Sequence, residues 1–267
     1  MAVLQKLTTG QLLDRVFSIY RRNFLLFFGI AIVPQFALII TAISPLAARS
    51  GLPPGSGNPV TYNWGAMGAF WIVSLILSSL AQGSATHAVS DIYLEQPTSI
   101  ASCFQRTGRK SISLTLLSFG YGLLIGLGLV LLIVPGIYWA ITYALAFPAM
   151  VVEDLSFSEA FSRSKDLVAG NRGRIALIGL LSVCVTWIIA LALGLPLGYL
   201  KLSLIGHFPG AAIAIDLVVK MFANALAMPV GLIGFTLAYY DARVEKEAFD
   251  LHYMMAQEPA TPGSVQA

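Results

Sequence analysis

The sequence predicts an all-α membrane protein with about six transmembrane helices and amphipathic helices along the cytoplasmic face. Hydrophobic residues make up 57% of the 267 residues and charged residues only 11%, whereas ordinary soluble domains have about 25% charged residues. Several uncharged runs reach the roughly 20 residues that a spanning helix needs. Short amphipathic segments lie between these runs. The net charge of +3 is distributed in small clusters beside apolar runs, so it does not indicate nucleic-acid binding.

Residues 134–174 show this organisation most clearly. Pro135-Gly136 predicts a turn, because proline presets φ at the second turn position and glycine tolerates a positive φ at the third. The turn divides the uncharged run 111–152 into two arms. The second arm, residues 137–152, has 16 residues, fewer than the roughly 20 of a full span. We therefore expect the turn to lie shallow in the membrane.

An amphipathic surface helix is expected next, over residues 156–169. Ser156 and Glu159 match a capping box, and Gly170 is a typical C-terminal stop. An amphipathic helix in a soluble core would show the same pattern, but the position between two apolar runs favours the headgroup plane of a membrane. The apolar face recurs at helical spacing and consists of Phe157, Ala160, Phe161, Ser164, Leu167 and Val168, with Arg163, Lys165 and Asp166 outside it.

Two further surface helices are predicted over residues 8–22 and 98–110. Each has a Thr or Ser at its start, an apolar face that contains a phenylalanine, and basic residues at its end. The phenylalanines of the three surface helices are Phe17, Phe104 and Phe161. Each surface helix precedes a pair of apolar runs, so the chain is interpreted as three repeats of one surface helix and two spans.

A single membrane domain is expected over residues 1–250, followed by a polar, partly disordered cytoplasmic tail at 251–267. The six spans are expected at residues 24–43, 65–93, 112–134, 137–152, 175–200 and 215–240.

The distribution of Lys and Arg predicts the orientation of the spans. Four basic residues precede the first span, three follow the second, four follow the fourth and two lie in the tail. The loops after the first and fifth spans contain only Arg49 and Lys201. Because cytoplasmic loops are enriched in Lys and Arg, both termini are expected in the cytoplasm.

Three segments resemble a known membrane domain. They are GQLLDRVFSIYRRNF, VPGIYWAITYALAFPAMVVEDLSFSEAFSRSKDLVAGNRGR and TLAYYDARVEKEAFD, in this order. Together they resemble the N-terminal membrane domain of some glycerophosphoryl diester phosphodiesterases and related stand-alone bacterial membrane proteins. The resemblance implies a six-helix inner-membrane domain. The phosphodiesterase chemistry of that family belongs to a soluble barrel, for which the 27 residues after Tyr240 are too few, so we expect no such activity.

No pattern of an enzyme site is present in the sequence. His87, His207 and His252 are scattered, and Cys103 and Cys184 have no metal-ligand spacing. No motif of a zinc hydrolase or a serine hydrolase occurs. We therefore expect no catalytic residues, no metal site and no cofactor.

Polar residues within the spans are the candidate functional positions. Gln82, Thr86, His87 and Asp91 follow one another at helical spacing in the second half of the second span. Intramembrane polar groups mark pathways or binding sites, but they also form hydrogen bonds between helices; the second interpretation is favoured here because Ser and Thr dominate. The other candidates are Asp216, Lys220 and Asn224, whose i, i+4, i+8 spacing also fits an ordinary interfacial ion pair.

Two functions are compatible with these features. The favoured one is a non-catalytic, accessory membrane protein that binds lipids or a partner protein through its cytoplasmic helices. The alternative is a permease-like carrier of a small amphiphilic solute, which would have broken helices and charges near the membrane midplane. The expected partners are membrane lipids, with another protein or self-association as further options, and no nucleic acid.

Overall fold

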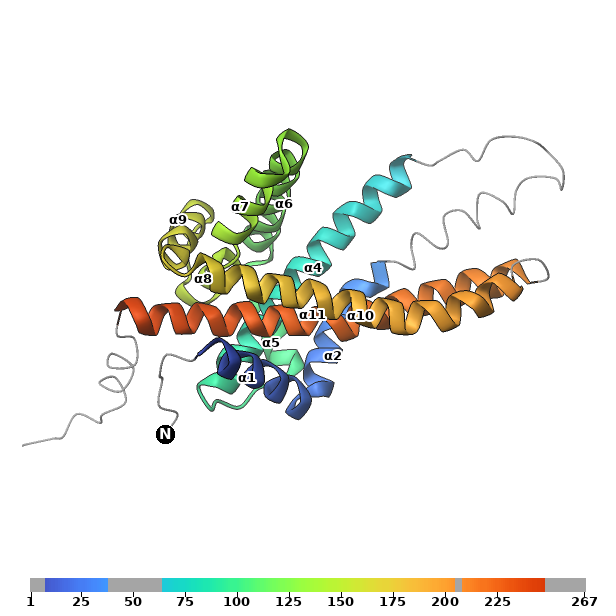
Figure 1. Cartoon of the computed structure of the whole chain (residues 1–267), viewed down its shortest axis with the longest axis horizontal. Coiled ribbons are helices and arrows are strands. Elements are labelled where there is room, and N and C mark those ends of the chain that lie inside the picture. The colour runs from blue at the N-terminus through green and yellow to red at the C-terminus, as the bar shows by residue number, and fades with distance from the viewer. Residues whose placement is uncertain (1–7, 38–63, 205–207, 248–267) are drawn as a thin grey trace, which may run out of the picture.

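The computed structural model describes residues 8–37, 64–204 and 208–247 (Figure 1). Within these ranges the chain is helical and has no strand. The elements are α1 (Thr9–Arg22), α2 (Phe24–Ile32), the 3-10 helix η1 (Val33–Phe36), α4 (Trp64–Tyr93), α5 (Ile100–Gly108), α6 (Ser111–Leu131), α7 (Ile133–Thr142), α8 (Ala146–Glu153), α9 (Phe157–Val168), α10 (Arg172–Leu204) and α11 (Pro209–Glu247).

The helices are long and apolar enough for a multi-pass membrane protein. Five of them meet the length and composition of a span, with α7 and α8 taken together as one. A sixth candidate span results if α1 and the α2–η1 segment are counted as one helix, although the chain bends by 83° between them. Because α1 is amphipathic whereas α2 is apolar throughout, the bend agrees with a helix that lies on a membrane surface before the chain enters the membrane.

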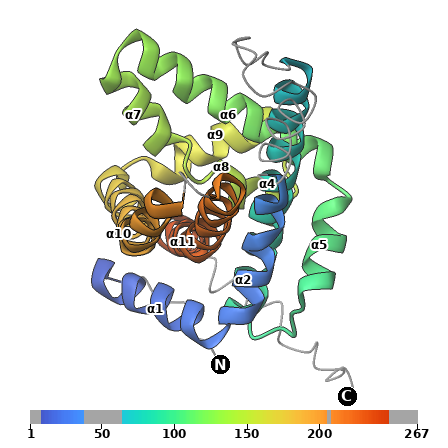
Figure 2. The same cartoon turned by 90° about the vertical axis from the view of Figure 1, so that its right-hand side faces the viewer.

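The long helices α10 and α11 pack side by side and form the axis of the structure (Figure 1). In Figure 2, the α6–α7 hairpin lies on one side of this pair and α1 on the opposite side. Helix α4 crosses the α10–α11 pair at an angle (Figure 1) and contacts α11, α5, α6 and α8. The main core is formed where α1, α4, α8 and α11 meet, and Leu12, Val89, Ala149, Ile233 and Tyr239 are almost fully buried there.

The helices predicted near residues 8–22, 98–110 and 156–169 and their caps are confirmed. The backbone N–H of Gln11 donates to the Thr8 hydroxyl, and that of Ser102 donates to the Ser99 hydroxyl. At α9, the backbone N–H and the hydroxyl of Ser156 both donate to the Glu159 carboxylate, at 2.9 and 2.7 Å. These bonds hold the pKa of Glu159 below its usual value.

The apolar face predicted for α9 is confirmed in most positions. Ala160, Ser164, Leu167 and Val168 are fully buried or nearly so, and Phe161 packs edge-on against Tyr143. Phe157 is half-exposed but touches the α6 backbone at Gly120. The surface helix is therefore attached to the spans through its apolar face.

The turn predicted at Pro135-Gly136 is wrong by a few residues. Helix α6 ends at Leu131, Leu132 is extended, and Pro135-Gly136 lies in the first turn of α7. Proline is tolerated there because its missing N–H would have no partner within the helix. Gly136 has another role: a Cβ on Gly128 of α6 would lie 2.7 Å from the Gly136 Cα. The two glycines thus let the two arms approach closely.

The span predicted at residues 137–152 is broken into two helices. Helix α7 ends at Thr142 and α8 begins at Ala146. Ser164 of α9 bridges the break: its hydroxyl accepts from the backbone N–H of Leu145 at 3.1 Å and donates to the carbonyl of Thr142 at 3.0 Å. The surface helix therefore supplies the hydrogen bonds that the interrupted helix has lost.

Other predicted boundaries differ at the helix ends. A helix over the residues of the predicted second span, 65–93, is confirmed by α4. The loop predicted between the last two spans is shorter, because α10 continues to Leu204 and α11 begins at Pro209. The first predicted span, 24–43, is described only to residue 37 and changes to a 3-10 helix at Val33. The tail predicted at 251–267 lies outside the described residues.

Replacing the bridging hydroxyl should destabilise the protein. Ser164→Ala leaves the Leu145 N–H and the Thr142 carbonyl without this buried partner, which costs about 1–3 kcal/mol. Ser162→Ala removes an exposed hydroxyl from the same helix and should be nearly neutral. Thermal unfolding of both purified variants in one detergent measures the difference. Equal melting temperatures would show that the break does not depend on Ser164.

Candidate functional site

A cluster of charged and aromatic residues lies where the ends of α4, α8 and α11 meet the surface helices. We call it the polar cluster, and its charged members are Asp91, Arg106, Glu153, Arg163, Arg174, Asp241 and Arg243.

Glu153, the last residue of α8, joins three helices. Its carboxylate accepts from Arg163 Nε of α9 at 2.8 and 3.0 Å and from the Tyr239 hydroxyl of α11 at 2.7 Å. Arg243 Nε of α11 forms an ion pair with it at 3.5 Å. A carboxylate at a helix C-terminus is unfavourable by itself because the helix dipole is negative there. The two guanidinium groups offset this effect and connect α8, α9 and α11.

The end of α11 is also bound to the segment between α9 and α10. Arg174 of α10 pairs with Asp241, and these side chains are only 13% and 4% exposed. Asn171 donates to Glu245 at 2.7 Å. Lys246 donates to the carbonyls of Asp166 and Ala169, where a cation is favoured at the C-terminus of α9.

Tyrosines connect the rest of the polar cluster. The Tyr240 hydroxyl lies 2.5 Å from the Ser90 hydroxyl of α4, and the Tyr240 ring packs against Tyr93. Asp91 of α4 forms a two-pronged ion pair with Arg106 of α5; this bond raises the pKa of Arg106, so the arginine stays charged. Arg15 of α1 lies over the Tyr93 ring at 5.2 Å. All three surface helices are thus connected to the spans.

The chemistry of the polar cluster is structural. Each of its carboxylates faces at least one guanidinium group. Among the described residues, no group of three or more His, Cys, Asp or Glu side chains is placed to hold a metal ion. A paired carboxylate that is already hydrogen-bonded is a poor general base, so the arrangement serves to hold helices together.

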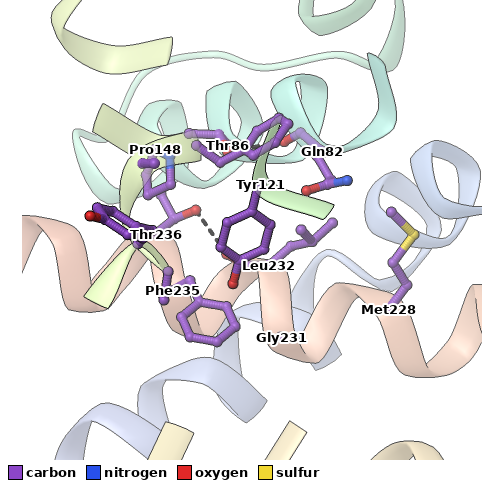
Figure 3. A pocket seen from close by; sticks show the side chains of 13 residues that line it. Gln82, Thr86, Tyr121, Pro148, Met228, Gly231, Leu232, Phe235 and Thr236 are labelled. Carbon is purple, nitrogen blue, oxygen red and sulfur yellow. Dashed lines mark hydrogen bonds between the residues drawn. The ribbon is translucent and has the colours of Figure 1, made fainter. Parts of the chain in front are cut away.

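A cavity of about 180 Å³ lies deeper in the helix bundle, between α4, α6, α8 and α11 (Figure 3). Gln82 and Thr86 line it from α4, Tyr121 from α6, and Leu232 and Phe235 from α11. The α7–α8 break also contributes to the wall through Tyr143 and Ala144. No charged residue lines this cavity.

The structure separates the four candidate positions on α4. Gln82 and Thr86 lie in the cavity wall, whereas Asp91 belongs to the polar cluster. His87 is half-buried on α4 and lies within electrostatic range of Arg106, Asp91 and Lys110. The series that looks like one polar stripe in the sequence is therefore divided between two environments.

The other three candidates lie far along α11, away from the cavity and the polar cluster. Asp216 and Lys220 form the predicted i, i+4 ion pair at 2.8 Å, with side chains 33% and 63% exposed. Asn224 is exposed on the same helix. None of the three lines the cavity. Their arrangement agrees with an ordinary interfacial ion pair.

Sequence reasoning missed the polar cluster as a site. It assigned Arg163 to the outer face of its helix, but the structure places this side chain against Glu153. A signal was present, because two of the three segments quoted for the family resemblance contain these residues: Glu153, Arg163, Arg174, Asp241 and Arg243. Their pairing depends on helix packing between distant segments, which periodicity does not show.

Removing one buried charge of the polar cluster should destabilise the fold strongly. Asp241→Asn leaves the buried Arg174 guanidinium without this carboxylate, which we expect to cost about 3 kcal/mol. Asp216→Asn removes an aspartate from an exposed pair on the same helix and should cost about 0.5 kcal/mol or less. The measurement is the denaturant midpoint of each purified variant. A similar shift for both would contradict the structural role of the buried pair.

Comparisons with known proteins assign no activity to the chain. No curated protein and no solved structure matches the chain. The family described as Domain of unknown function (DUF7847) matches residues 98–242, which is more than half of the chain and reaches from the start of α5 to Asp241 of the polar cluster. The chain therefore belongs to the DUF7847 family.

Proposed function

We propose that this chain is a non-catalytic, accessory membrane protein with six spans and cytoplasmic termini, and that its surface helices bind anionic lipid headgroups. The observation that carries this proposal is the corner between α1 and α2. Arg21 and Arg22 are exposed there, beside Phe24 and Leu25, which are 38% and 79% exposed.

The corner has the chemistry of a membrane interface. Neither Arg21 nor Arg22 forms an ion pair with another residue of the described part of the chain. The chain bends by 83° between an amphipathic helix and an apolar one. Guanidinium groups at such a corner face the phosphates while the neighbouring apolar side chains enter the acyl region. Each Lys or Arg near an anionic leaflet contributes about 1 kcal/mol.

Two observations support the cytoplasmic orientation. The surface helices bring Arg109 and Lys165, both exposed, to the same end of the bundle as the polar cluster. Toward the opposite ends of α10 and α11, the only basic residues are Lys201 and Lys220. An excess of Lys and Arg is typical of the cytoplasmic side.

The proposal includes a relation to the membrane domain of glycerophosphoryl diester phosphodiesterases in a bacterial inner membrane. Its support is the set of three resembling segments, two of which supply Glu153, Arg174 and Asp241 to the polar cluster. An accessory role fits a domain whose ionisable groups are engaged in holding helices together.

A carrier of a small amphiphilic solute is the second candidate. The observation that favours it is the α7–α8 break in the cavity wall, because transporters bind their substrates at broken helices. Against it, the charged candidate Asp91 is held by Arg106 at the bundle end rather than in the cavity. Uptake of an amphiphilic solute into proteoliposomes would favour the carrier. If the protein binds lipid but no solute is taken up, the accessory role is favoured.

Neutralising the corner should weaken the binding of anionic lipid. We expect Arg21→Gln/Arg22→Gln to lower the affinity for phosphatidylglycerol at least tenfold, since two charges of about 1 kcal/mol each are lost. Lys201→Gln/Lys220→Gln removes the same charge from the other end and should leave the affinity unchanged. Native mass spectrometry of retained lipids measures both. Unchanged affinity in the first variant would refute headgroup binding at the corner.

Cysteine labelling tests the orientation. The background carries Cys103→Ala and Cys184→Ala, so that only an introduced cysteine can react. One probe is Ser203→Cys at the end of α10, and the other is Ser158→Cys at an exposed position of α9. In intact cells an impermeant maleimide should label position 203 only, and position 158 should react after permeabilisation. Labelling of Ser158→Cys in sealed cells would overturn the proposed topology.

A further inference from the structure

We propose that the cavity between α4, α6, α8 and α11 binds an uncharged amphiphile, whose polar group hydrogen-bonds to the Gln82 carboxamide. This proposal is independent of headgroup binding at the α1–α2 corner. It starts from the hydrogen bonds of the Gln82, Thr86, Tyr121 and Thr236 side chains in the cavity wall.

Three hydroxyl groups of the wall already donate to backbone carbonyls. Thr86 donates to Gln82 at 3.0 Å, Thr236 to Leu232 at 2.8 Å, and Tyr121 to Ala140 at 3.0 Å. Each hydroxyl has one hydrogen to donate, so these groups offer only acceptor lone pairs to a ligand.

The Gln82 carboxamide differs from them. Its side chain forms no hydrogen bond with another residue in the described ranges, and it lies in the cavity wall (Figure 3). An amide can donate two hydrogen bonds and accept others. Gln82 is only partly buried, so its carboxamide is accessible from the cavity. It can serve a molecule that both accepts from Gln82 and donates to it.

The remaining wall determines the class of this molecule. Phe147, Met228, Leu232 and Phe235 provide an apolar surface that suits an alkyl chain. The cavity of about 180 Å³ is several times the volume of about 30 Å³ that one water occupies in the liquid. It holds a chain segment with a small polar group.

A charged group would be disfavoured in this place. No cation or anion lines the wall. The nearest charges along the helices belong to the polar cluster: Asp241 is five residues beyond Thr236, and Glu153 is five residues beyond Pro148. Five helical residues correspond to about 7.5 Å. Both carboxylates are engaged by guanidinium groups, so a headgroup with a hydroxyl or an ester, as in a monoacylglycerol, fits better than a carboxylate or a phosphate.

Photolabelling tests this site. The probe is a monoacylglycerol with a diazirine in its acyl chain, applied to the full chain in nanodiscs. We expect it to label peptides from α8 and α11 that line the cavity, and unlabelled monoacylglycerol should compete. The fatty acid with the same diazirine chain, ionised at pH 8, should label these peptides at least fivefold less. Equal labelling by both probes, or labelling without competition, would overturn the proposal.

Variants at Gln82 test the role of its amide. Gln82→Leu keeps the side-chain size and should reduce specific labelling about tenfold, while the melting temperature without probe stays equal or rises because an unpaired polar group is lost. Gln82→Met is a second variant with the same expectation. Gln105→Leu changes an exposed glutamine of α5 and should label normally. Full labelling of a folded Gln82→Leu variant would refute the assignment, whatever the corner variants show.

Discussion

The position of Glu153 is the constraint on which much of this structure depends. A carboxylate that ends a helix is stable only where cations and hydrogen-bond donors meet it. Here they come from α9 and from α11, through Arg163, Tyr239 and Arg243. The same attachment brings Ser164 of α9 to the α7–α8 break, which it bridges. Because that break forms part of the cavity wall, an ion-pair junction at the bundle end also determines the shape of a site deeper in the bundle.

The molecule keeps its charges and its cavity apart. The polar cluster around Glu153 and Asp241 lies at one end of the bundle, while the cavity is lined by amide, hydroxyl and apolar groups. This division agrees with the low dielectric of a membrane interior, where an ion is costly but a hydrogen-bonding neutral group is tolerated. It also explains how a lipid headgroup and an uncharged amphiphile could be bound by one chain without competing for the same residues.

Local signals in the sequence predicted a large part of the fold. The caps at Thr8, Ser99 and Ser156 depend on residues three apart, so the starts of the surface helices could be placed closely. The long helices could be placed from the length of the uncharged runs, because this too is a local property of the sequence. The α7–α8 break could not be predicted, because its hydrogen bonds come from Ser164, some twenty residues further on. Likewise, the sequence Pro135-Gly136 is typical of a turn, and only the contact between Gly136 and Gly128 of α6 shows that it lies inside a helix where the two arms approach closely. Gln82 and Asp91 have similar sequence contexts, and only the neighbouring helices assign one to a cavity and the other to an ion pair.

The attachment of so many residues to the end of α11 has a consequence for biogenesis. A chain emerges from the ribosome N-terminus first, so Ser90, Glu153 and Arg174 are synthesised long before their partners Tyr240, Tyr239 and Asp241. By contrast, the α6–α7 contact joins neighbouring helices and can form at once. Before α11 is complete, Asp91 can already pair with Arg106 and Glu153 with Arg163, whereas Arg174 still lacks Asp241. The synthesis of α11 therefore completes the polar cluster, and it joins helices made early in the chain to the helix made after them.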